Sequence, residues 1–303
     1  MVDISVDFGF MKLKNPIIPA SGTFGYGEEF EDFFNLDELG AFVFKGIYRN
    51  KRPGNKPPRI HETSSGLLNS IGLAGPGAYE LKEIIKRVYN KTHTPIIINV
   101  CGGDDDEYLE VAEIFDDMKE VSMLELNISC PNVKIGGKCP AMSDSHTYKL
   151  VNRIKSNTQK PLIVKLSPNV SDVASIAVSA QEAGADAISV VNTFLGLAVD
   201  LKKRKPVFEN VFAGLSGPAI KPLALKIVWE VAQRVSIPVI GIGGIASGKD
   251  VLEYILVGAS AVQIGTINMV EPTASIRILK EIKDLMSELN IDSLNDIRGK
   301  LKI

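Results

Sequence analysis

Eight short apolar runs, most of them rich in β-branched residues, recur along the chain. They are nearly continuous rather than alternating, which is typical of parallel strands that are covered on both faces. The predicted strands are residues 16–21, 42–47, 95–100, 123–129, 161–167, 187–193, 238–244 and 261–266.

Segments with helical periodicity lie between these runs, and the clearest are residues 79–89, 108–118, 172–184 and 223–235. Ser247 and Asp250 have the Ser-x-x-Asp spacing of a capping box, which predicts a helix start. Eight strand–helix units favour a closed (β/α)8 TIM barrel, an α/β fold, over an open sheet. The alternating amino-terminal segment predicts a β-hairpin that covers the barrel floor.

Two intervals between predicted strands are unusually long, residues 48–94 and 194–237, and both contain turn-rich stretches. Long ordered loops tend to be lids, binding loops or contact surfaces. In a barrel we expect them over the carboxyl ends of the strands, where barrel chemistry takes place. Neither linker composition nor low complexity divides the chain, so residues 1–303 are predicted to form one domain.

Composition and charge reduce the number of functional classes to which the chain can belong. Hydrophobic residues make up 45% and charged residues 23%, and the net charge of −2 comes without a basic patch, which argues against nucleic-acid and membrane partners. No apolar run approaches the roughly 18 residues of a membrane span, and no secretory signal is evident, so we expect a cytoplasmic protein. Three cysteines and three histidines lack metal-site spacing, so no metal site is predicted.

Polar side chains end many of the strands and would converge on one barrel mouth. They are Ser21, Lys45, Asn99, Asn127, Lys165 and Asn192. A single Asn there would more simply satisfy local backbone groups, but two lysines and three amides at equivalent positions indicate a functional site.

Glycines end the last two strands, at Gly241, Gly243, Gly244 and Gly265, the last followed by Thr266. Glycine lets backbone N–H groups approach an anion, and the helix after Ser247 adds its positive end. Barrels often bind phosphate with these loops, so a phosphate-bearing cofactor is favoured over glycines that serve turns alone.

Cys130 follows the fourth strand within Asn127–Asn132. A cysteine there is more often a small buried hydrophobe. The turn that follows would instead carry it over the barrel mouth, where a cationic neighbourhood would lower the pKa of its thiol and make it a candidate base. Cys101 and Cys139 lack such a setting and are interpreted as structural or incidental.

With these residues in place, the chain resembles class 1 dihydroorotate dehydrogenases, and within them the flavin subunit of the NAD-linked subtype. The resemblance runs along nearly the whole chain. It rests on NPIIPASGTFGYG (15–27), FVFKGI (42–47), NSIGL (69–73), ELNISCPNVK (125–134), VKLSPNV (164–170), VVNTFLG (190–196), GLSGPAIKP (214–222) and IGIGGIASGKD (240–250).

The resemblance implies one FMN at the barrel mouth. The residues that would bind it are Ser21, Lys45, Gly46, Asn99, Asn127, Lys165, Val191, Gly217, Gly243, Gly244, Gly265 and Thr266. It also implies that dihydroorotate is oxidised to orotate in pyrimidine biosynthesis. The residues that would hold this substrate are Lys45, Asn69, Ser70, Ile71, Gly72, Leu73, Asn127, Asn132, Asn192 and Thr193. Cys130 would take the C5 proton while hydride passes from C6 to flavin N5.

The family's membrane-bound class uses serine as its base, whereas this chain has Cys130, which leaves NAD or fumarate as the final oxidant. The residues of the motifs NISCPNVK and GLSGPAIKP favour the NAD-linked subtype. The resemblance then implies a homodimer joined to an electron-transfer subunit that carries FAD and a 2Fe–2S cluster, together a heterotetramer. Two stretches depart from the family pattern, Ala74-Gly75-Pro76-Gly77 and Lys138-Cys139-Pro140-Ala141-Met142.

Other interpretations remain open at this stage. A related flavin barrel would act on uracil-like dihydropyrimidines with the same cysteine, and a fumarate-linked class 1 enzyme would share the same substrate. A phosphate-binding isomerase or lyase would hold no flavin, and a scaffold subunit would bind flavin without reducing it.

Overall fold

The computed structural model describes residues 2–128 and 143–303. Its centre is an eight-stranded parallel sheet in the order β3-β16-β15-β10-β9-β8-β7-β4. The strands are β3 (Ile17–Pro19), β4 (Phe42–Val43), β7 (Ile96–Val100), β8 (Met123–Asn127), β9 (Leu162–Lys165), β10 (Ala187–Val190), β15 (Val239–Ile242) and β16 (Ala261–Ile264).

Every one of these strands lies within a predicted run. The two end strands, β3 and β4, approach each other where the Gly40 backbone N–H donates to the Ile17 carbonyl at 3.0 Å. The sheet is therefore nearly closed, and the predicted (β/α)8 barrel is confirmed.

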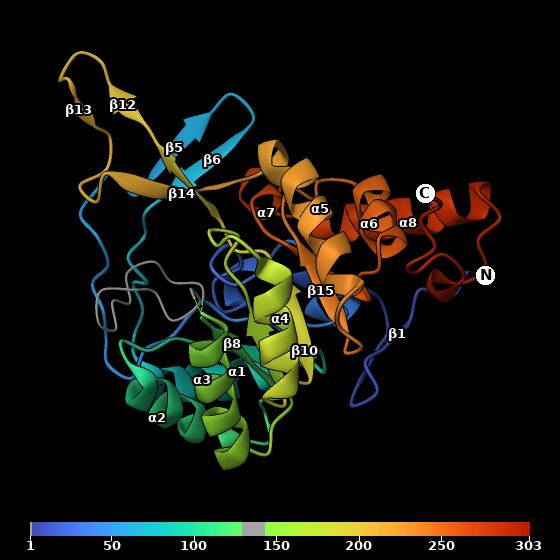
Figure 1. Cartoon of the computed structure of the whole chain (residues 1–303), viewed down its shortest axis with the longest axis horizontal. Coiled ribbons are helices and arrows are strands. Elements are labelled where there is room, and N and C mark those ends of the chain that lie inside the picture. The colour runs from blue at the N-terminus through green and yellow to red at the C-terminus, as the bar shows by residue number, and fades with distance from the viewer. Residues whose placement is uncertain (1, 129–142) are drawn as a thin grey trace.

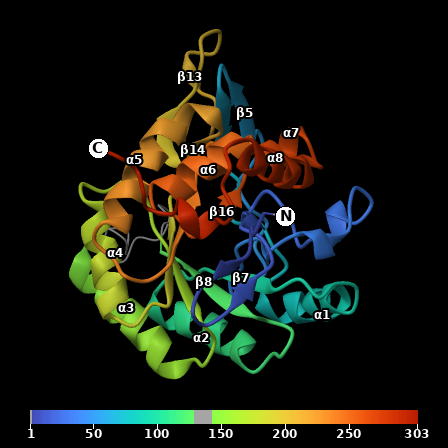
Figure 2. The same cartoon turned by 90° about the vertical axis from the view of Figure 1, so that its right-hand side faces the viewer.

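Helices surround the sheet, as Figure 2 shows in a view toward the end of the barrel that carries the N-terminus. They are α1 (Ala78–Tyr89), α2 (Asp105–Asp116), α3 (Asp144–Asn157), α4 (Val173–Glu182), α5 (Lys221–Ala232), α6 (Gly248–Leu256), α7 (Ile267–Val270) and α8 (Ala274–Glu288), with short 3-10 helices η1 (Glu28–Phe30), η2 (Leu36–Glu38), η4 (Pro218–Ile220) and η5 (Leu294–Asp296). Apolar side chains between strands and helices form the main core.

The amino-terminal hairpin has the predicted position. Strands β1 (Val6–Asp7) and β2 (Lys12–Leu13) pair antiparallel. Val6, Phe8 and Leu13 are buried against residues at the amino ends of the barrel strands, such as Ile163. The hairpin therefore plugs the barrel floor and leaves the opposite end for a site.

The two long intervals build a second sheet that the sequence analysis predicted only as loops. Strands β5 (Ile60–Thr63), β6 (Gly66–Asn69), β11 (Phe194–Leu197) and β14 (Phe212–Ser216) form an antiparallel sheet in the order β11-β14-β6-β5. The hairpin of β12 (Val199–Asp200) and β13 (Lys205–Pro206) extends from it, far from both termini (Figure 1). This sheet stands over the carboxyl ends of the barrel strands, as expected for the long intervals.

Among the helices in residues 2–128 and 143–303, none combines the length and the hydrophobicity that a bilayer-spanning segment requires.

Candidate active site

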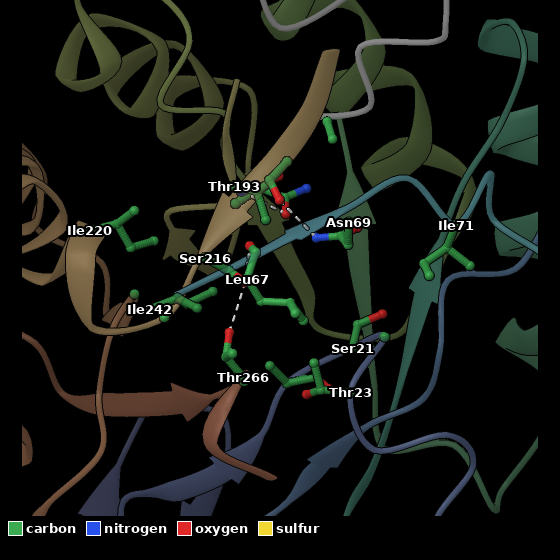
Figure 3. A pocket seen from close by; sticks show the side chains of 18 of the residues that line it. Ser21, Thr23, Leu67, Asn69, Ile71, Thr193, Ser216, Ile220, Ile242 and Thr266 are labelled. Carbon is green, nitrogen blue, oxygen red and sulfur yellow. Dashed lines mark hydrogen bonds between the residues drawn. The ribbon is translucent and has the colours of Figure 1, made fainter. Parts of the chain in front are cut away.

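A cavity of about 470 Å³ opens at the carboxyl end of the barrel, beneath the antiparallel sheet. This volume is within the usual range for small-molecule pockets. Of the residues predicted to bind cofactor or substrate, all those that the structure describes line the cavity except Asn99. Figure 3 shows some of them. Asn69 ends β6 of the antiparallel sheet, called the upper sheet below, and Thr193 directly precedes its strand β11. Ser21 and Thr266 follow the barrel strands β3 and β16. Cys130 and Asn132 lie outside the described residues.

Glycines at one end of the cavity adopt backbone conformations that other residues rarely take. Gly217, Gly243 and Gly244 have φ values of 92°, 133° and 68°. A Cβ added at Gly244 would stand 2.8 Å from the Lys221 backbone nitrogen and 2.9 Å from the Gly217 carbonyl oxygen. The backbone here is therefore packed too closely against its neighbours to admit a side chain, and only glycine gives this wall of the cavity its shape.

The first turn of α6 lies next to these glycines, and a capping box holds it. The Ser247 hydroxyl accepts from the Asp250 backbone N–H, and the Asp250 carboxylate accepts from the backbone N–H groups of Ser247 and Ala246 at 2.9 Å. Burial alone would raise the pKa of Asp250, but hydrogen bonds from Lys221 and from the Ala246 backbone outweigh it and hold the pKa below its usual value. The helix start therefore stays ordered, and its positive end favours an anion.

Lys45 contributes a cation from the opposite wall. Its backbone N–H donates to the Gly25 carbonyl at 3.0 Å, which fixes the chain after β4. Burial lowers the pKa of its ammonium below the usual 10.5, and the nearby Arg59 guanidinium lowers it further, against an opposing effect of Glu29. Arg59 is itself held by the backbone carbonyls of Asn55 at 2.6 Å and Pro53 at 2.8 Å.

Amide side chains order the loops around the cavity. Asn69 donates to the Gly214 carbonyl at 3.1 Å, and Asn55 donates to the Ser70 hydroxyl at 2.9 Å. Asn169 donates to the Thr193 carbonyl at 2.9 Å. These contacts place several hydrogen-bonding groups at fixed points around the cavity, which suits a ring with donors and acceptors.

A buried polar layer lies directly below the cavity. Glu125, fully buried in β8, accepts from Asn99 Nδ2 at 2.6 Å, Lys165 Nζ at 3.3 Å, Ser189 Oγ at 3.0 Å and also from Gln263 Nε2. Asn99 in turn accepts from Asn127 at 3.0 Å. Asn99 does not line the cavity because it lies in this layer below it, where it helps to orient Asn127 and Lys165.

Residues 4–286 match the family model described as dihydroorotate dehydrogenase. The chain belongs to the dihydroorotate dehydrogenase family. It is 47% identical over 301 residues to a protein of Geobacter metallireducens, covering 99% of each chain, and 45% identical over 303 residues to one of Phocaeicola vulgatus, covering 100% of each. A protein of Bacteroides thetaiotaomicron is 44% identical over 304 residues, again over 100% of each. All three are named dihydroorotate dehydrogenase B (NAD(+)), catalytic subunit, so the resemblance predicted from the motifs is confirmed.

One of the two departures from the dihydroorotate dehydrogenase pattern has a definite place in the structure. Gly75 exchanges two backbone hydrogen bonds of 3.0 Å with Arg52, so the stretch 74–77 is held against the preceding loop. The other departure, residues 138–142, lies outside the described residues.

The sequence analysis missed several residues that line this cavity or contact those that do. Asn55, Arg59 and Asn169 come from loops whose contacts no local pattern reveals. Glu125 and Gln263 did leave a signal, because each places a polar side chain in the middle of an otherwise apolar strand.

Proposed function

We propose that this chain oxidises dihydroorotate to orotate with FMN in pyrimidine biosynthesis, as the catalytic subunit of an NAD-linked enzyme. The observation that carries the proposal is that three groups share one cavity at the barrel mouth. They are the glycine cradle (Gly217, Gly243 and Gly244), the lysines Lys45 and Lys165, and the amides Asn69, Asn127 and Asn192. The relatives named as NAD-linked catalytic subunits support it over the fumarate-linked alternative.

The described residues fit FMN. At Gly217, Gly243 and Gly244 a Cβ would collide with Gly66, Ala224 and Lys221, so only glycine gives the cradle this backbone shape. With Gly265 and Thr266 its backbone would bind the phosphate. Around the ring and the ribityl chain would stand Ser21, Lys45, Gly46, Asn99, Asn127, Lys165 and Val191. When bound, FMN supplies the hydride acceptor.

The substrate would lie against the ring under the upper sheet. Lys45 would attract its carboxylate, and the Asn69–Leu73 loop with Asn127, Asn132, Asn192 and Thr193 would bind the ring's imide edge. Cys130 would take the C5 proton as hydride leaves C6 for flavin N5, so that the C5=C6 double bond forms. Lys165 would stabilise the negative charge that reduction brings to the pyrimidine edge of the flavin.

Electrons would then leave through a second subunit that carries FAD and a 2Fe–2S cluster and passes them to NAD. The name "catalytic subunit" carried by the relatives supports such a partner. We propose a homodimer of this chain with two such partners, a heterotetramer. The cytoplasmic location stays a prediction from the sequence.

The deciding experiment is the absorption spectrum of the purified chain before and after anaerobic addition of dihydroorotate. We expect a flavin spectrum that dihydroorotate bleaches and dihydrouracil does not. A colourless protein would favour the isomerase or lyase, bleaching by dihydrouracil would favour the dihydropyrimidine enzyme, and flavin that no pyrimidine reduces would favour the scaffold subunit.

Cys130→Ala tests the proposed base. The variant should keep its flavin but lose most of its reduction by dihydroorotate at neutral pH, because no group remains to take the C5 proton. Cys139→Ala makes the same change in the same segment and should reduce at the wild-type rate. An unimpaired Cys130→Ala rate would remove Cys130 from this role.

A further inference from the structure

Glu125 and Lys165 form an ion pair that differs from the others in the described part of the chain. Their side chains are 0% and 5% exposed, whereas every other ion pair there has at least one side chain exposed by more than 20%. Burying two charges costs free energy that a pair of apolar side chains would not, so stability alone does not explain the pair. Its place directly below the cavity points to a function.

The pair is part of a network that crosses the barrel. The groups that donate to Glu125 come from β7, β9, β10 and β16, so one carboxylate connects five of the eight strands beneath the site. Each carboxylate oxygen accepts two of these bonds, which fixes the orientation of Glu125.

This network also fixes Lys165. An ammonium group has three N–H donors. Glu125 Oε1 accepts one at 3.3 Å and Gln263 Oε1 accepts another at 3.2 Å. Among contacts within the described residues, one donor is left for a ligand in the cavity that Lys165 lines.

We propose that Glu125 is a positioning residue that holds the Lys165 ammonium toward bound flavin and, by balancing its charge, sets the flavin's reduction potential. The proposal rests on the proposed FMN site. With Glu125 ionised, the pair is neutral while the flavin is oxidised, and reduction adds a negative charge above it. Without the carboxylate, the ammonium is unbalanced and favours reduced flavin more strongly.

The test is the midpoint potential of the flavin bound to Glu125→Gln, measured by anaerobic titration against reference dyes. We expect the reduction equilibrium to shift at least tenfold toward reduced flavin, which is about 30 mV more positive for a two-electron couple. Asp186→Asn is the matched control. Asp186 pairs with Lys155 at 2.6 Å near the amino end of β10, so the same charge change should leave the potential at its wild-type value.

The outcomes separate this proposal from the one on which it rests. Flavin bound to Glu125→Gln with an unchanged potential overturns the role of Glu125 and leaves the FMN site intact. A wild-type chain that binds no FMN overturns the proposed function itself.

If Glu125→Gln alone does not fold, a double variant with Lys165→Met removes both charges and avoids a buried unpaired one. The double variant should then fold and show a cooperative thermal unfolding transition, measured without added flavin, which Glu125→Gln alone lacks. A double variant that is as unfolded as Glu125→Gln would show that the Glu125 carboxylate is not there to balance Lys165, and the proposal would fail.

Discussion

Lys45 illustrates how a single side chain in this cavity is tuned by its surroundings. Burial and the Arg59 guanidinium both disfavour its charged form and lower its pKa, although the proposed role at the substrate carboxylate needs that charge. The charge at this position is therefore lost at a lower pH than for an exposed lysine.

This environment predicts the alkaline side of the pH profile. The affinity for dihydroorotate should fall as pH rises, with a midpoint below 10.5, because the Lys45 ammonium loses its proton there. In Arg59→Gln the midpoint should move to higher pH, because one positive charge that disfavours the ammonium is gone. The measurement is the KM for dihydroorotate against pH.

Lys56→Gln is the control for this prediction, since it removes a cation from the same loop at a position whose side chain is 80% exposed. Its midpoint should match the wild type. An unmoved midpoint in Arg59→Gln would contradict the charge effect. If the KM of that variant were also raised by the same factor at every pH, the substitution would have disturbed the loop instead.

At the scale of elements, α6 connects the fold to the proposed phosphate site through its capping box. Ser247→Ala should cost about 1 kcal/mol in the free energy of unfolding, since the Asp250 backbone N–H loses its acceptor. It should also weaken FMN binding, because the first turn of α6 borders the glycine cradle. Denaturant unfolding and FMN titration measure the two effects.

Ser293→Ala removes the capping serine of η5, the other capping box in the described residues, which lies beside the amino terminus on the floor side. A comparable loss of stability with wild-type FMN affinity is expected there. Equal FMN affinity in both variants would show that the α6 cap serves the fold alone.

Most of the elements could be predicted because their signal is local. Buried parallel strands are continuous apolar runs, and the capping box at Ser247 is a pattern of four residues. The strands of the upper sheet were missed because they are partly or wholly exposed and, in β6, β11 and β14, contain glycine. Their pairing also joins distant residues such as Asn69 and Gly214, and no local pattern reveals such a contact.

At the scale of the whole molecule, the hairpin at the floor and the site at the mouth are separate. Phe8 is 4% exposed and packs among the amino ends of the strands, with its ring centroid 5.6 Å from that of the partly buried Phe10. Phe8→Ala should therefore destabilise the fold by about 3–5 kcal/mol. FMN affinity should stay unchanged under native conditions, as measured by flavin titration beside denaturant unfolding.

Phe10→Ala changes the same kind of side chain in the same hairpin and should cost less, because less surface is buried there. A loss of FMN affinity in Phe8→Ala that parallels its loss of stability would contradict the separation of floor and mouth.

The site could be predicted as far as barrel geometry brings residues together. Parallel strands end at one mouth, so polar residues at their carboxyl ends, such as Lys165 and Asn127, had to converge. Asn55 reaches the same cavity from the first long interval and Asn169 from the loop after β9, and their place depends on tertiary contacts that strand order does not specify.

Both termini lie on the floor side (Figure 1), and the Asp3 backbone N–H donates there to the Asp292 carbonyl at 2.7 Å. A linker between the termini would therefore run over the floor, and the exposed turn between β12 and β13 offers a place to cut a circularly permuted version. Attachment to an electrode through either end would turn the barrel mouth toward solution, with its ligand entrance unobstructed.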